Sequence, residues 1–88
     1  MLEWREPDEA TEPQMATLER LALHCARILK GDPAMMMSLG AQMIVTGAIV
    51  AAGGCENRAL TDDQLARADS VLALCERRMR MRLGDHPG

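Results

Sequence analysis

The chain has 88 residues, which is the length of a single domain, and a formal net charge of −3 at pH 7. Hydrophobic residues make up 48% of it, which excludes a disordered chain, and the acidic excess argues against a general nucleic-acid binder. Trp4 is its one aromatic residue, so the core must consist of aliphatic and methionine side chains, which suit helix-on-helix packing. We therefore expect an all-α protein.

Residues 1–12 form an acidic segment that is interrupted by proline. Arg5 is its only cation, and its carboxylates are Glu3, Glu6, Asp8, Glu9 and Glu12. This composition is typical of a flexible tail that becomes ordered only on docking. Trp4 has two interpretations: it folds back over one end of the bundle, or it anchors a docking peptide, because tryptophan is enriched in binding hot spots.

The first helix is predicted over about residues 12–30. Thr11 and Gln14 have the spacing of a weak capping box, and Gly31 is a stop signal. The apolar residues follow the i, i+3, i+4, i+7 pattern of one helix face, at Leu18, Leu21, Ala22, Cys25, Ile28 and Leu29. Because only Gly31 and Asp32 separate this helix from the next, the two should be antiparallel neighbours.

The central segment Pro33–Cys55 contains no charged residue. Asp32 followed by proline favours a helix start and Gly53-Gly54 favours a stop, which predicts a helix over about residues 33–53. A helix that is apolar on nearly all sides is buried in protein or spans a membrane. Small and polar residues fill about half of the segment, and no aromatic belt or basic cluster flanks it. We therefore expect burial in protein and regard a membrane segment as unlikely.

Small residues on the central helix have two possible uses, close packing within the fold or a helix crossing at a twofold axis. The amide of Gln42 would suit such an axis, because a buried amide that pairs with its own copy fixes the register. The predicted dimer interface consists of Gly40, Gln42, Met43, Gly47 and Ala51.

The third helix is predicted over about residues 61–83, since Thr61 and Gln64 form a capping box and Gly84 stops it. The residues that should face the neighbouring helices form a seam along it and are spaced three and four apart, at Leu65, Ala68, Leu72, Cys75 and Met79. Residues 13–84 should thus form one domain, a three-helix up-down-up bundle, with a tail at 85–88. Two helices cannot easily cover a third that is apolar all round, so either part of the central helix is exposed as a binding groove or a second copy covers it. We favour homodimerisation, which would complete the bundle.

Residues that could carry chemistry are few. Cys25 and Cys75 lie on apolar faces and should be core residues, whereas Cys55 follows the glycine pair in a loop as an exposed thiol without a visible base. His24 and His86 do not have the spacing of a zinc site. We expect a cytoplasmic protein with reduced cysteines that is not an enzyme and has no cofactor or metal.

A cluster of arginines near the end of the third helix is the one marked concentration of charge, at Arg77, Arg78, Arg80 and Arg82. Cations there complement the helix dipole, and they also offer an anion-binding surface. The sequence predicts an interaction module, a regulator, inhibitor or adaptor that docks on another protein through Trp4 and these arginines. The alternatives are a nucleic-acid-binding regulator, which lacks aromatic side chains for stacking, and a small membrane-associated protein.

Overall fold

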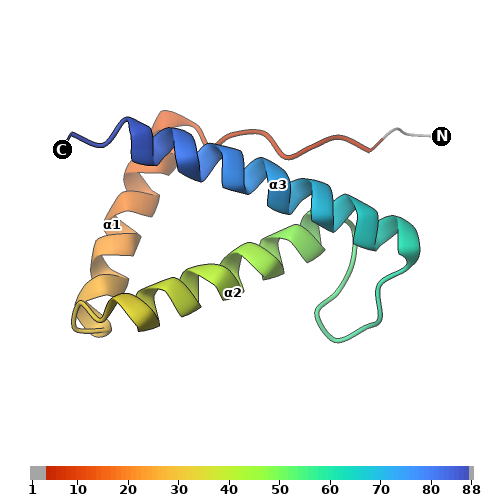
Figure 1. The fold of residues 1–88 in the computed structure, drawn as a ribbon, viewed down its shortest axis with the longest axis horizontal. Helices are drawn as coiled ribbons and strands as arrows, with labels where there is room; N and C mark the ends of the chain where they lie inside the picture. The colour runs from red at the N-terminus through yellow and green to blue at the C-terminus, as the bar shows by residue number, and fades with distance from the viewer. Residues whose placement is uncertain (1–3, 88) are drawn as a thin grey trace. The chain divides into compact units, whose positions relative to one another are not determined.

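The computed structural model describes residues 4–87 of the chain, which form α-helices and no strand over that range (Figure 1). The helices are α1 (Glu12–Ile28), α2 (Pro33–Ala51) and α3 (Asp62–Gly84). The predicted all-α class is therefore confirmed, and each helix boundary lies within two residues of the predicted one. The up-down-up bundle arrangement stays a prediction.

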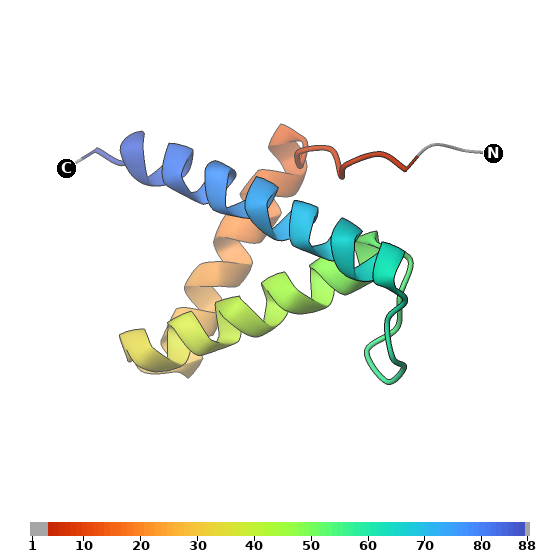
Figure 2. The ribbon, with the colours of Figure 1, turned by 45° about the vertical axis from the view of Figure 1, so that its right-hand side comes forward.

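The described residues group into two compact units, and the division falls within α2. One unit, residues 8–42, contains α1 and the first half of α2. The other contains residues 4–7 and the chain from Met43 onward, with the second half of α2 and all of α3. The loop between α2 and α3 belongs to this second unit and is drawn in green to teal in Figure 2.

In the unit of residues 8–42, both helix starts are capped as the sequence predicts. The Thr11 Oγ1 accepts from the backbone N–H of Gln14 at 3.4 Å, and the Gln14 side chain accepts from the backbone N–H of Thr11 at 2.8 Å. The Asp32 carboxylate accepts from the N–H groups of Ala34 at 3.0 Å and Met35 at 3.4 Å. These bonds satisfy backbone donors that have no partner within the first helical turn.

In the other unit, the capping box of α3 also reaches the end of α2. The Thr61 Oγ1 accepts from the Gln64 N–H at 3.1 Å, and Gln64 Oε1 accepts from the Thr61 N–H at 3.0 Å. The Gln64 amide nitrogen then donates to the carbonyl of Gly53 at 3.1 Å. Gly53 has a φ of 85°, the left-handed conformation that favours glycine and ends α2. One side chain thus fixes the start of α3 against the end of α2.

The core of this unit is small and built from alanines. Ala48, Ala52 and Ala68 are buried, and Val71 and Leu72 pack against them. The predicted seam of α3 is exposed at its ends, because Leu65 and Met79 lie on the surface. Gly54 has a packing role here, since a Cβ at that position would overlap the side chain of Leu60 and lie 3.3 Å from Ile49 Cγ2.

The helix α2 is not buried within one chain, and its burial by a second copy stays a prediction. Ala48 is its only buried residue, and Met37 and Met43 have 75% and 64% of their surface exposed. The reason is that the alanine core is too small to cover a helix with apolar side chains on nearly every side. α1 also contains no buried residue, although Leu18, Leu21 and Ile28 follow the predicted apolar face.

Candidate docking surfaces

The exposed apolar side chains of α2 form the first candidate surface, here called the α2 surface. Its members are Met35, Met36, Met37, Leu39, Met43, Val45 and Val50. No charged residue lies within Pro33–Ala51, so removal of this surface from water carries no cost of desolvating a charge. Among the described residues, α2 is the one helix long and apolar enough to cross a membrane, with 19 residues and a mean hydropathy of 1.7.

The five predicted dimer-interface residues are accessible in the single chain. Gln42, Met43 and Gly47 are exposed, and Gly40 and Ala51 are half-buried. A Cβ built on Gly40 or Gly47 would meet no atom within 4 Å, so neither glycine is needed for close packing inside the chain. Of the two uses predicted for small residues, packing within the fold applies to Gly54, whereas no neighbouring atom in the chain requires a glycine at Gly40 or Gly47.

Residues Trp4–Pro7, here called the N-terminal arm, are held against the unit that contains α3. The indole Nε1 of Trp4 donates to the carbonyl of Ala51 at 3.1 Å, which satisfies a backbone acceptor at the end of α2. Trp4 and Pro7 are half-buried, whereas Arg5 and Glu6 between them are exposed. Of the two interpretations of Trp4, folding back onto a helix end is the one that the structure displays.

The predicted arginine cluster divides between two environments. Arg78 is half-buried and its Nη2 donates to the carbonyl of Pro7 at 2.9 Å, so this guanidinium holds the second end of the arm. Arg77, Arg80 and Arg82 are exposed. Arg80 forms an ion pair with Glu76 at 3.1 Å, and because both side chains are well exposed, this pair contributes little to stability. One arginine of the cluster therefore binds the arm within the chain, and the other three form an exposed cationic face.

A cavity of about 260 Å³ lies beside the arm, and we call it the arm groove. Seven of its lining residues come from two helices, Ile44, Gly47 and Ala48 from α2 and Val71, Leu74, Cys75 and Arg78 from α3. Pro7 of the arm completes the lining. Apart from Arg78 the walls are apolar or weakly polar, so the groove suits an apolar group whose neighbouring carbonyl accepts from a guanidinium.

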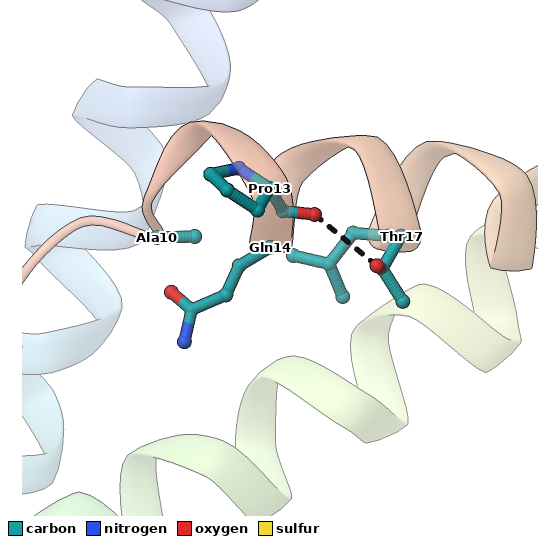
Figure 3. Close-up of a pocket in the computed structure, with 5 residues that line it drawn as sticks. Ala10, Pro13, Gln14 and Thr17 are labelled. Atoms are coloured by element: carbon teal, nitrogen blue, oxygen red, sulfur yellow. Dashed lines mark hydrogen bonds between the residues drawn. The ribbon is translucent and has the colours of Figure 1, made fainter.

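A second hollow, of about 490 Å³, adjoins the first turns of α1 (Figure 3). It is lined by Ala10, Pro13, Gln14, Thr17 and Leu18. The Thr17 hydroxyl donates to the Pro13 carbonyl at 3.1 Å, as the dashed line shows (Figure 3). None of these side chains titrates near neutral pH, and the one hydroxyl among them, that of Thr17, is bonded to a backbone carbonyl and not to a general base.

Within residues 4–87 no disulfide joins the three cysteines. Cys25 and Cys75 are half-buried, Cys55 is exposed, and all three are free thiols. The first two were predicted as core residues, and they are only partly covered because the core is so small. The described residues include no group of three or more histidine, cysteine or acidic side chains that could hold a metal ion.

Comparison with known proteins gives no family: no protein-family model, no curated protein and no solved structure matches the chain.

Proposed function

We propose that this protein is a non-enzymatic helical docking module that self-associates through α2 and presents the cationic end of α3 to another protein. The observation that carries the proposal is the α2 surface, in which a helix of 19 residues has only Ala48 buried. A second copy of the chain is the occupant that we favour. Met43 and Gly47 would lie at the centre of the interface, with the Gln42 amides pairing across it.

The exposed apolar side chains of α2 support this proposal. Met37 and Met43, for example, have 75% and 64% of their surface exposed. Fully burying one methionine or valine side chain contributes about 1.5–3 kcal/mol. Because association itself costs about 4–15 kcal/mol, most of the α2 surface has to be buried in the dimer.

The proposed face toward a partner consists of the exposed arginines of α3, Arg77, Arg80 and Arg82. They occupy the last turns of the helix, where cations are also favoured by the helix dipole. A protein partner with an acidic surface is the chemistry that these side chains fit. Trp4 and Arg78 were predicted to belong to the same surface, but Trp4 is bonded to Ala51 and Arg78 to Pro7, so both would reach a partner only after the arm leaves.

The self-association is tested by light scattering after size exclusion, in buffer without detergent. We expect the mass of a dimer. Met43→Glu should give a monomer, because it places a carboxylate in the interface. Met81→Glu on α3 is a matched control, since Met43 and Met81 are 64% and 65% exposed, and it should leave the dimer intact. A monomer for the unmodified chain, or equal behaviour of the two variants, would contradict the proposal.

Membrane association is a second candidate, favoured by the length and hydropathy of α2. The polar stripe of Ser38, Gln42 and Thr46 opposes it, because an unpaired amide in lipid is costly. Flotation with uncharged phosphatidylcholine vesicles separates the two candidates. A chain that stays at the bottom of the gradient and is dimeric without detergent supports docking, and a chain that floats supports the membrane.

A further inference from the structure

We propose that the α2 and α3 walls of the arm groove bind an extended peptide, and that in the dimer they hold the N-terminal arm of the second copy in place of the chain's own arm. This inference rests on the proposed self-association and names a further contact within it. It assigns a role to Trp4, Pro7 and Arg78, which the docking face of α3 does not use.

The contacts that hold the arm depend on few features of the arm itself. At one end an indole N–H of the arm donates to the Ala51 carbonyl at 3.1 Å, and at the other a carbonyl of the arm accepts from Arg78 at 2.9 Å. Both bonds join residues far apart in sequence, by 47 and 71 positions. The same bonds can therefore form with the arm of another chain, since no local turn or shared helix is part of them.

The spacing within the arm defines the ligand that the groove accepts. Trp4 supplies the donor and Pro7, three residues later, supplies both the acceptor and an apolar ring on the groove wall. Arg5 and Glu6 between them are exposed and carry no part of the recognition. The site thus fits an extended segment with an aromatic N–H donor followed by an apolar residue whose carbonyl is accessible.

The position of the groove favours a second copy as the source of this segment. Gly47 lines the groove and Ala51 accepts the bond from Trp4, and both belong to the predicted dimer interface. A copy that docks along α2 therefore brings its own arm close to the same acceptor and wall. Residues 8–11, which connect the arm to α1, have no regular structure and can redirect it.

The energetics of exchange are also favourable. Replacing one arm by an identical one preserves every contact of the groove, which is why exchange of identical elements is a low-cost route to dimers. Once two copies are joined through α2, the second arm is presented at an effective concentration of about millimolar for a short flexible link. Exchange then adds the bonds of two arms to the interface.

Cross-linking between two different single-cysteine chains tests the exchange. The first chain carries Pro7→Cys, with Cys25, Cys55 and Cys75 each changed to Ala. The second chain keeps only Cys75, which lines the same groove as Pro7, and carries a tag that distinguishes its mass. The chains are mixed, unfolded and refolded together, treated with a short bis-maleimide and analysed by denaturing mass measurement. Each chain treated alone reports any cross-link between like cysteines.

We expect a mixed, cross-linked dimer in the two-chain sample. Adding Trp4→Ala to the first chain should slow its formation about tenfold, the effect of losing about 1.4 kcal/mol of arm docking. A third chain with both Pro7→Cys and Cys75 reports docking within one chain. Circular dichroism of each chain verifies that helix content is retained, so that a missing cross-link is not caused by unfolding.

The outcomes separate this inference from the proposed function. If light scattering shows a dimer but only the third chain cross-links, and does so internally, the arm stays in its own chain and the exchange is overturned while self-association stands. If no sample cross-links, the arm does not occupy the groove and the inference is also overturned. If the unmodified chain is a monomer, self-association and exchange fail together.

Discussion

The substitution Gly40→Ala separates the effect of a residue on the single chain from its effect on the dimer. In the single chain an added Cβ at Gly40 meets no atom within 4 Å. Alanine in a helix interior is more favourable than glycine by about 0.5–1 kcal/mol, because glycine loses more conformational freedom on folding. The substitution should therefore stabilise the isolated chain. Gly40 also lies outside the arm groove, so the arm is not affected.

In the proposed dimer the same methyl group has the opposite effect. Gly40 belongs to the predicted α2 interface, and a twofold axis places one added methyl from each copy in it. Overfilling a packed interior costs about 1–3 kcal/mol, so two methyls weaken the dimer by at least about 2 kcal/mol. This corresponds to a roughly thirtyfold higher Kd. The gain in helix propensity occurs in both monomer and dimer and cancels from the Kd.

The assay measures the Kd by sedimentation over a dilution series and the helix stability by urea unfolding followed with circular dichroism. Gly84→Ala is the control, because it is also a helical glycine with open space but lies at the end of α3. It should leave the Kd unchanged. A Kd for Gly40→Ala that is equal to or lower than that of the unmodified chain would refute a close helix crossing at this glycine.

Further predictions concern the caps, the arm and the arginines. Thr61→Ala should lower the free energy of unfolding by about 1 kcal/mol, measured with urea. Thr11→Ala should cost less, because its bond to the capped N–H is 3.4 Å long, against 3.1 Å at Thr61. Trp4→Phe keeps an aromatic ring, smaller than the indole, and removes the donor to Ala51, so it should lower the free energy of unfolding by at least about 1 kcal/mol, measured with urea and circular dichroism. Reversing Arg77 and Arg80 to Glu should not change retention on heparin at low salt, and a salt-dependent retention that the reversal abolishes would favour the nucleic-acid alternative.

Features set by short stretches of sequence were predictable. The capping boxes at Thr11 and Thr61 formed because a threonine and a glutamine three residues on can each accept from the other's backbone N–H, whatever the rest of the chain does. The cap at Asp32 and the stop at Gly53 are local in the same sense. Such signals were enough to predict the bounds of each helix to within two residues, and the helices define the all-α class.

Features that join distant residues were not predictable from these patterns. The arm groove was missed, because its walls come from three stretches of sequence that no periodicity connects. The bond from Arg78 to Pro7 spans 71 positions, and nothing in an arginine cluster says which of its members will turn inward. The one available hint was the opposite charge of the acidic tail and the arginines, which points to attraction but not to a backbone carbonyl as the acceptor.

The incomplete burial of α2 bears on function. Most helical stability in proteins comes from packing of an apolar face. Within the single chain that packing is limited to Ala48 and its neighbours in the alanine core. The uncharged sequence therefore favours a cover that one copy does not supply, and association should stabilise α2 further. A second copy provides this cover, and the open backbone at Gly40 and Gly47 is where it can approach most closely.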